Sequence, residues 1–245
     1  MDHWLFVHVM KTAGTSFRTL LEQSFDAEIY PTRAELAAEK NQWYVHAPEL
    51  IARAADGRID LAARRVVCGH YAANLRDHLP GAWRAAVFLR EPVARTVSII
   101  GHRRRQAGFL KRHLGRWGVA DMLKNDVFVR QQVADYQTKV FAMDGLQNVN
   151  RGLAINRDGF ARAVANLRRT EFVGLTEAFR DSMALFEKTA GMGFRQEELH
   201  ANRAKSHKAE TPEEDLAAIR ALVPYDIELY AIARELLAER IKAAA

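Results

Sequence analysis

The chain has 245 residues, of which 49% are hydrophobic and 27% are charged, and its formal net charge is +6. These values are typical of a globular protein and exclude the compositions of disordered, collagen-like and repeat proteins. The length favours a single domain, residues 1–245, around one sizeable core.

Two sequence features predict the compartment. Cys68 is the only cysteine and lies in an apolar run, so we expect a buried thiol and a reducing environment. The first residues lack the features of a signal peptide, and no apolar stretch reaches the roughly 18 residues that a membrane span needs. We therefore expect a soluble cytoplasmic protein without stable membrane insertion. The sequence does not indicate the oligomeric state.

Three mostly apolar segments in the first 90 residues are predicted to be buried parallel strands. They are Leu5–Val9, Val66–Cys68 and Ala85–Leu89. Their apolar residues are continuous instead of alternating, which is typical of strands covered on both faces of a sheet. Each segment ends in a loop that carries polar or charged residues.

The remaining predicted elements are helices and one further strand. They are a helix from Phe17, a helix beginning at Pro92, a largely helical stretch Ala120–Met143, a helix at Phe160–Leu167, a strand at Glu171–Leu175, a helix at Phe179–Ala190 and, from Thr211, a helical hairpin that includes Tyr225–Ile241. This alternation predicts an α/β fold, a parallel sheet with helices on both faces and a helical C-terminal segment. Ligands of such sheets bind beyond the carboxyl ends of the strands.

The loop after the first predicted strand combines small and polar residues with the start of a helix. Its residues are Lys11, Thr12, Ala13, Gly14, Thr15 and Ser16. Backbone N–H groups and the helix dipole at such a junction attract an anion, so the loop suits a phosphate or a sulfate. The alternative is that Thr15 or Ser16 only caps the helix. The Walker pattern does not fit, because Lys11 precedes Gly14 instead of following a glycine.

The segment Phe6–Ser16 resembles the 5′-phosphosulfate-binding loop of the carbohydrate sulfotransferases related to heparan sulfate 2-O-sulfotransferase. Those enzymes take a sulfuryl group from 3′-phosphoadenosine 5′-phosphosulfate (PAPS). The resemblance implies a P-loop-like α/β fold, a PAPS-binding role for Lys11 to Ser16, and a soluble family member of bacterial type.

A second segment, Arg90–Ser98, resembles the family pattern R-D-P-x-x-R-x-x-S, with Glu91 in place of Asp. The resemblance implies that Arg90 and Ser98 bind the 3′-phosphate of the donor. A guanidinium is suited to this task because it can grip a phosphate with two parallel hydrogen bonds. The alternatives are that Arg90 pairs with a carboxylate at the sheet edge and that Ser98 is a solvated helix residue. We expect Arg95 to make an intrahelical or loop contact.

Three further segments resemble the family less sharply. Tyr136–Lys139 is similar to a family segment N-x-Q-T-[RK], but Asp135 stands where the pattern has Asn. Phe172–Glu177 resembles a late strand of the family. Asn202 and Lys205 lie where relatives have a loop over the nucleotide, and the resemblance implies that they contact it.

His70 is the candidate general base. It ends the second predicted strand, at the sheet edge where Lys11 and Arg90 are expected, and relatives carry a base in a Gly-His pair at this place. A neutral imidazole can take the proton of an acceptor hydroxyl. His8 is interpreted as a packed residue, and His102 has no comparable context. Lys11 is expected to stabilise the leaving oxygen. We expect no metal to be required, because the transferred sulfonate carries less charge than a γ-phosphate, and the sequence has no typical ligand set.

The acceptor is expected to be a hydroxylated carbohydrate, either anionic or neutral, or another small hydroxylated molecule. The segment Gly101–Gly118 contains no acidic residue. Its basic residues are Arg103, Arg104, Arg105, Lys111, Arg112 and Arg116. They form either a solvated face or an acceptor surface, to which Trp43, Tyr44 and Trp117 could add sugar-stacking rings.

A nucleotide or small-molecule kinase and a basic nucleic-acid-binding module stay as alternatives, although the second leaves the paired phosphate motifs unexplained.

Overall fold

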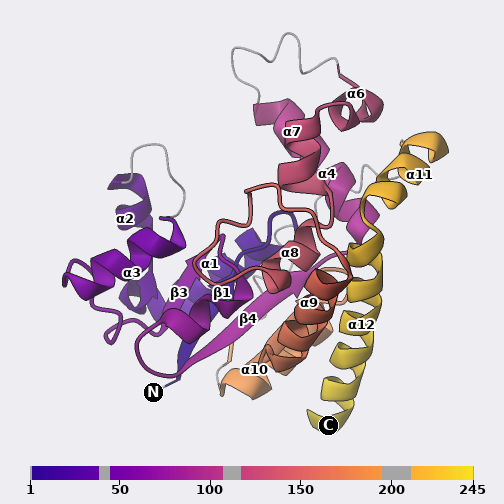
Figure 1. The fold of residues 1–245 in the computed structure, drawn as a ribbon. Helices are drawn as coiled ribbons and strands as arrows, with labels where there is room; N and C mark the ends of the chain where they lie inside the picture. Colours follow the sequence, from indigo (N-terminus) through magenta and orange to yellow (C-terminus); the bar gives the residue numbers. More distant parts are fainter. Residues whose placement is uncertain (1, 39–44, 107–116, 192, 195–210, 245) are drawn as a thin grey trace.

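Five parallel strands form the sheet at the centre of the computed structural model, in the order β2-β3-β1-β4-β5 (Figure 1). The structure describes residues 2–38, 45–106, 117–191, 193–194 and 211–244. The strands are β1 (His3–Val7), β2 (Ile29–Tyr30), β3 (Val66–Gly69), β4 (Trp83–Leu89) and β5 (Phe172–Leu175). The predicted α/β sheet is confirmed, and the assignment of the chain to a single domain stays a prediction.

Two predictions about the strands needed correction. The first strand begins at His3 and ends at Val7, because the amide of Val9 already turns back to the carbonyl of Val7 at 3.0 Å. The edge strand Ile29–Tyr30 was not predicted, since two residues are too few to carry a periodic pattern.

One face of the sheet packs its aromatic side chains against α1 (Gly14–Phe25) and α10 (Phe179–Ala190). The ring of Phe17 lies 4.7 Å from Phe6, 5.0 Å from Phe88 and 4.9 Å from Phe186, centroid to centroid. Gly174 makes room for this packing, because a Cβ there would lie 2.6 Å from the ring of Phe88. Cys68 is fully buried in the same sheet, as predicted.

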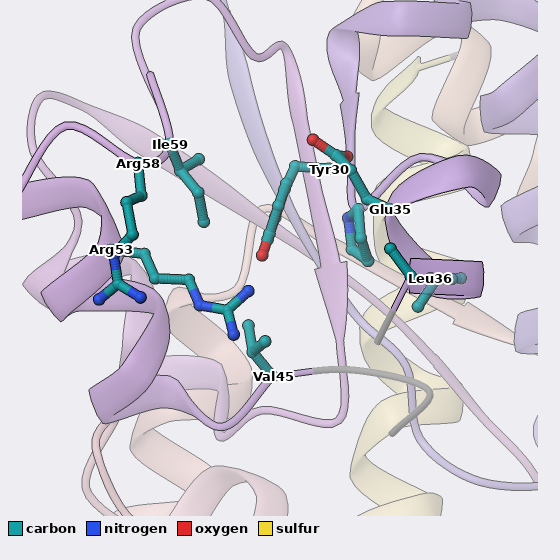
Figure 2. A pocket seen from close by; sticks show the side chains of 9 residues that line it. Tyr30, Glu35, Leu36, Val45, Arg53, Arg58 and Ile59 are labelled. Carbon is teal, nitrogen blue, oxygen red and sulfur yellow. The ribbon is translucent and has the colours of Figure 1, made fainter. Parts of the chain in front are cut away.

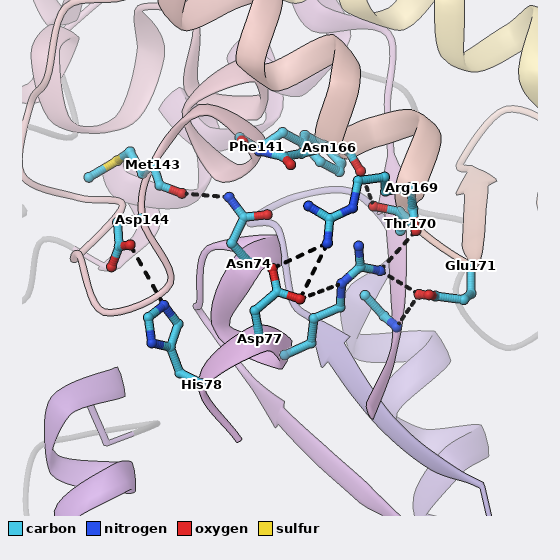
Figure 3. A network of polar contacts seen from close by, with 12 residues as sticks. Asn74, Asp77, His78, Phe141, Met143, Asp144, Asn166, Arg169, Thr170 and Glu171 are labelled. Carbon is cyan, nitrogen blue, oxygen red and sulfur yellow. Dashed lines mark hydrogen bonds and ion pairs between the residues drawn. The ribbon is translucent and has the colours of Figure 1, made fainter. Parts of the chain in front are cut away.

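The other face is covered by the short helix η2 (Ala73–His78) and, beyond it, by α8 (Tyr136–Ala142) and α9 (Arg157–Arg169). Arg76 of η2 donates to Glu171 at 2.6 Å, and Glu171 also accepts the amide of Ala85 at 2.7 Å. This polar network, drawn in Figure 3, ties η2 to the amino-terminal ends of β4 and β5. It therefore stabilises the fold at the end of the sheet opposite to the loops that follow β1, β3 and β4.

The C-terminal helix α12 (Pro224–Ala244) runs beside α9 and α10 and covers the β5 edge of the sheet (Figure 1). The preceding helix, α11 (Glu213–Leu222), turns away from α12. It packs Leu216 and Ile219 into a second apolar cluster with Val93 of α4 (Pro92–Gln106). The helical C-terminus is thus confirmed, but the two helices do not form a side-by-side hairpin.

The stretch Ala120–Met143, predicted to be largely helical, is divided into short pieces. They are α6 (Val119–Leu123), α7 (Asp126–Phe128), the π-helical turn η4 (Val129–Val133) and α8. The last break falls at Asp135, whose φ of 44° is left-handed and cannot continue a helix. The other described helices are η1 (Asp26–Glu28), α2 (Arg33–Ala38) and α3 (Ala47–Ala55). None of the helices in these ranges is long and apolar enough to cross a membrane.

Candidate active site

The sheet brings the three candidate loops to one edge. Val7, the last residue of β1, pairs with Gly69 of β3 on one side and with Val87 of β4 on the other. The residues that follow these strands therefore leave the sheet side by side. Lys11, His70 and Arg90 all lie in these loops, as the sequence predicted.

The loop between β1 and α1 has an unusual backbone. Lys11 and Ala13 both have left-handed conformations, with φ of 70° and 65°. For residues other than glycine this costs about 1 kcal/mol or more each, and such strain concentrates at functional sites. Left-handed residues alternating with others also turn successive N–H groups to one side, which is the backbone pattern of an anion-binding nest.

Side chains from other elements hold the carbonyl groups of this loop. Arg95 donates from Nε to the carbonyl of Met10 at 3.2 Å, and Arg90 donates from Nη1 to the carbonyl of Lys11 at 3.3 Å. In a trans peptide the N–H points opposite to the C=O. The amides of Lys11 and Thr12, which share these peptides, therefore point away from the two guanidinium groups. The arginines thus orient part of the predicted anion-binding loop.

The residues of this loop differ in how far they are exposed to solvent, although the motif suggested that all of them bind the ligand. Thr12 is fully buried, and its hydroxyl donates to the carbonyl of Val9 at 2.9 Å, so it stabilises the loop itself. Gly14 is buried, whereas Thr15 is exposed and Ser16 is partly exposed at the start of α1. Thr15 and Ser16 are therefore the hydroxyl-bearing residues of this loop that solvent reaches.

Arg90 is fixed mainly through its backbone. Gln137 accepts the amide of Arg90 and donates to its carbonyl, both at 2.9 Å. The buried Nε has no hydrogen-bond partner among the described residues, and its nearest carboxylate oxygen, in Glu177, lies 3.9 Å away. This separation is at the upper limit for an ion pair. The contact with Glu177 therefore gives only weak support to the alternative that Arg90 pairs with a carboxylate at the sheet edge.

Arg95 makes the predicted loop contact and is fully buried. Besides Met10, it donates from Nη1 to the carbonyl of Gln132 at 2.6 Å, and its guanidinium stacks over the ring of Tyr136 at 4.1 Å. One buried cation thus joins the loop, the π-helical turn and α8. Arg95 is therefore a structural support of the loop.

Positive charge gathers around Lys11. The pKa of Lys11 is lowered by burial and by the charges of Arg105 and Arg90. Burial also lowers the pKa of His102, followed by the charges of Lys11, Arg103 and Arg105. Mutual repulsion between cations at one place is relieved when an anion binds there.

His102 is close enough to Lys11 for the lysine charge to lower its pKa, and the sequence analysis did not place it at this edge of the sheet. It lies four residues after Ser98 in α4, so the two side chains share one face of the helix. Ser98 of the motif is partly exposed and lies on the same face of α4 as His102. This face is near Lys11, because the charge of Lys11 lowers the pKa of His102. The helical spacing from Ser98 was a signal that could have identified His102.

His70 is held in one tautomer. Its Nδ1 lies 2.6 Å from the carbonyl oxygen of His8, and because a carbonyl only accepts, Nδ1 carries the proton. The lone pair of the neutral ring is therefore on Nε2. Burial lowers the pKa of His70, partly offset by this hydrogen bond, and the charge of Arg103 lowers it further. A neutral imidazole whose Nε2 carries the lone pair is the form that a general base needs.

Several predicted site features fall outside the described residues. They are Asn202, Lys205, Trp43, Tyr44, Lys111, Arg112 and Arg116. Of the basic run, Arg103, Arg104 and Arg105 are described, in the last turn of α4. Within the described ranges no group of three or more His, Cys, Asp or Glu side chains could hold a metal ion.

A cavity of about 370 Å³ lies at the β2 edge of the sheet, apart from these loops (Figure 2). Charged side chains on its wall already have partners: Arg53 pairs with Glu49 at 2.7 Å, and Glu35 pairs with Arg64 at 2.9 Å. The cavity therefore lacks the excess of positive charge found around Lys11.

No protein-family model matches the chain. Over 78 residues, or 32% of this chain, it is 38% identical to "Heparan-sulfate 6-O-sulfotransferase 2" from Gallus gallus, covering 19% of that protein. The proteins of the same name from Danio rerio and Homo sapiens are each 37% identical, over 80 and 78 residues that cover 17% and 13% of their lengths. The chain thus spans less than a fifth of these relatives, and the 2-O-sulfotransferase relation stays a prediction. The similarities support a relation to the carbohydrate sulfotransferases.

Proposed function

We propose that this chain is a sulfotransferase that moves the sulfuryl group of PAPS to a hydroxyl of a carbohydrate. The observation that carries the proposal is the junction of Lys11 and Arg90, where a strained loop with oriented amides meets an excess of positive charge. Such a junction suits a ligand with several anionic groups. The candidate base His70 directly follows Gly69, the last residue of the adjacent strand β3, at the same edge of the sheet.

On the donor side, the amides of Lys11 and Thr12 and the hydroxyls of Thr15 and Ser16 bind the 5′-phosphosulfate. Arg90 and Ser98 bind the 3′-phosphate. Asn202 and Lys205 add nucleotide contacts, as the family resemblance implies. Lys11 neutralises the 5′-phosphate oxygen as the bond between this oxygen and sulfur breaks, because positive charge placed beforehand stabilises charge that develops in the transition state.

On the acceptor side, Nε2 of His70 takes the proton of the attacking hydroxyl while its oxygen bonds to sulfur. The hydrogen bond from Nδ1 to the carbonyl of His8 places the lone pair of the neutral ring on Nε2. Sulfuryl transfer resembles phosphoryl transfer with a loose, in-line transition state, so positioning and electrostatics supply most of the catalysis. In this proposal no metal takes part.

The acceptor we propose is an anionic polysaccharide. The relatives with 37–38% identity are named for heparan sulfate, an anionic polysaccharide. The last turn of α4 carries Arg103, Arg104 and Arg105, and Arg103 is near enough to His70 to influence its pKa. A basic helix end beside the proposed base would attract such an acceptor to the reacting atoms.

The decisive experiment is a calorimetric comparison of adenosine 3′,5′-bisphosphate with 5′-AMP, in the presence of EDTA. We expect the bisphosphate to bind at least tenfold more tightly, after which transfer of labelled sulfate from PAPS to desulfated heparan is measured. Equal affinities would remove the sulfotransferase assignment. In separate titrations without EDTA, tighter binding of Mg²⁺–ATP than of the bisphosphate would support the kinase alternative, and tight binding of duplex DNA alone would support the nucleic-acid alternative.

A further inference from the structure

The ring of His8 fills a space between the start of α1 and the proposed base. A Cβ built on Gly14 would lie 2.0 Å from Cδ2 of His8 and 2.3 Å from its Nε2. Gly14 does not have a left-handed φ, so its backbone does not require glycine. Glycine is required at position 14 because the His8 ring lies so close that any side chain there would collide with it.

The other contacts of His8 lead to His70. The two imidazole rings lie 4.9 Å apart, centroid to centroid, at an interplanar angle of 32°. Two residues earlier, on β1, the ring of Phe6 stacks with the His8 ring at 5.7 Å and 17°. The backbone of His8 also takes part, since its carbonyl accepts from His70 Nδ1 and its amide donates to Gly69 at 2.8 Å. His8 thus contacts His70 through both its main chain and its ring.

His8 is also kept without charge. Its pKa lies well below 6.5, because burial disfavours the charged ring and the nearby groups His70, Arg18 and Lys11 repel a further cation. A charged ring beside His70 would make protonation of the base harder. A neutral ring supplies a fixed plane without that penalty.

We propose that His8 is a positioning residue for His70, setting the plane of the base relative to the PAPS-binding loop. This inference rests on the proposed function of the same site. The carbonyl contact can be made by any residue at position 8, whereas the ring contact requires a flat side chain. Its removal leaves a gap between Gly14 and His70 into which the imidazole can rotate. Because an error of about 1 Å in placing a reacting group can cost roughly a hundredfold in rate, this packing is expected to affect turnover.

The first test is the turnover number of His8→Ala and His8→Phe, with PAPS and desulfated heparan. We expect His8→Ala to lose roughly ten- to a hundredfold while keeping its affinity for adenosine 3′,5′-bisphosphate, and we expect His8→Phe to recover most of the loss. His3→Ala is the matched control. His3 lies on β1, 2.8 Å from a backbone carbonyl and 4.9 Å from the ring of Trp83, but at the far end of the sheet.

The second test asks whether His8 acts through His70. In a His70→Ala background, His8→Ala is expected to cause little further loss, because the residue that it positions is absent. Independent losses in the two variants would overturn the proposal. If His8→Ala does not fold, His8→Leu fills a similar volume without a flat ring and takes its place in both tests.

A third measurement separates this inference from the proposed function, because it needs no turnover. Nitrogen-15 NMR of the His70 ring reports its tautomer and its pKa. We expect His70 of the unaltered protein to carry its proton on Nδ1, and we expect His8→Ala to raise the pKa of His70 towards 6.5 by opening the ring to water. The tautomer should stay the same, because the carbonyl at position 8 remains, whereas an unchanged pKa of His70 in His8→Ala would overturn the positioning role, whether or not the protein transfers sulfate.

Discussion

Arg90 donates a hydrogen bond from Nη1 to the carbonyl oxygen of Lys11, 3.3 Å away, and so joins the ends of the neighbouring strands β1 and β4. The two residues also repel each other electrostatically, since the charge of Arg90 helps to lower the pKa of Lys11. The hydrogen bond thus keeps two cations together at a site where neither has a full counter-charge among the described residues. A multiply charged anion would satisfy both of them at once.

We expect Arg90→Ala to weaken binding of adenosine 3′,5′-bisphosphate by roughly ten- to a hundredfold, since charge-assisted hydrogen bonds contribute about 1.5–3 kcal/mol. Binding of 5′-AMP should change much less, because it lacks the 3′-phosphate. Calorimetry with both nucleotides provides the measurement.

Arg84→Ala is the control for this variant. Arg84 also lies on β4, but at its amino-terminal end, where it pairs with Asp2 at 2.9 Å and stacks over Trp4. It should leave both affinities unchanged. An equal loss for the two nucleotides in Arg90→Ala would show that Arg90 supports the loop without recognising the 3′-phosphate.

Lys11→Met is expected to lower the rate of transfer in single-turnover experiments more than it lowers donor affinity. The charge of Lys11 is needed most when the leaving oxygen becomes negative, and methionine keeps a similar length without the charge. Should the variant lose donor affinity and keep its rate, Lys11 would be a binding residue only.

The pH dependence of the rate gives a separate test of Lys11. A lysine is charged below its pKa, and the pKa of Lys11 is lowered by burial and by Arg105 and Arg90. The rate should therefore fall on the alkaline side at a pH below that of an ordinary lysine. In Arg105→Gln one repelling charge is removed, so this fall should move to higher pH. A movement to lower pH, or none, would contradict the assignment.

Much of the frame of this site could be predicted from the sequence. Apolar runs such as Ala85–Leu89 identify buried strands, and loops that follow parallel strands meet at one edge, so Lys11, His70 and Arg90 could be placed together without a structure. Arg95 could also be assigned to a loop contact.

Other features depend on contacts between distant residues and left no local pattern. Gln137 holds the backbone of Arg90 across 47 positions of sequence, and the contact is visible only after α8 is placed against β4. The break at Asp135 is another example, because its left-handed backbone is stabilised from α12. Local helix propensity cannot anticipate such tertiary effects.

His70→Ala should reduce turnover by roughly 10²–10⁴-fold and leave nucleotide affinity unchanged, as is typical for loss of a general base. The rate of the unaltered protein should fall as pH decreases, because only neutral His70 accepts a proton. Burial lowers the pKa of His70, so this fall should lie below pH 6.5. A folded His70→Ala protein with near-normal turnover would exclude His70 as the base. A lower melting temperature with little specific effect on rate would indicate that His70 only stabilises the end of β3.

Asp135 and Asp226 cap each other's helices at the junction of α8 and α12. Asp135 accepts the backbone amide of Asp226 at 3.0 Å, and Asp226 accepts the amide and the hydroxyl of Thr138 at 2.7 and 2.8 Å. Burial, followed by the charge of Asp226, raises the pKa of Asp135 from 3.8 to about 6. At neutral pH the fold therefore holds two carboxylates that repel each other.

We expect Asp135→Asn to stabilise the protein. An asparagine keeps an oxygen for the amide of Asp226, tolerates the left-handed φ of 44°, and carries no charge.

Because the folded pKa of Asp135 is raised, the folded state binds more protons than the unfolded state between pH 3.8 and about 6, and its stability falls as pH rises through this window. The variant avoids that fall. Its free energy of unfolding above pH 6 should exceed that of the unaltered protein by up to about 3 kcal/mol, since one pKa unit corresponds to about 1.4 kcal/mol, and the gain should vanish below pH 3.8. Denaturant unfolding at several pH values measures this difference, with the exposed Asp158→Asn in the first turn of α9 as the control that should show no gain. If Asp135→Asn were less stable than the unaltered protein at pH 7, the charge of Asp135 would be needed at this junction and the assigned repulsion would be wrong.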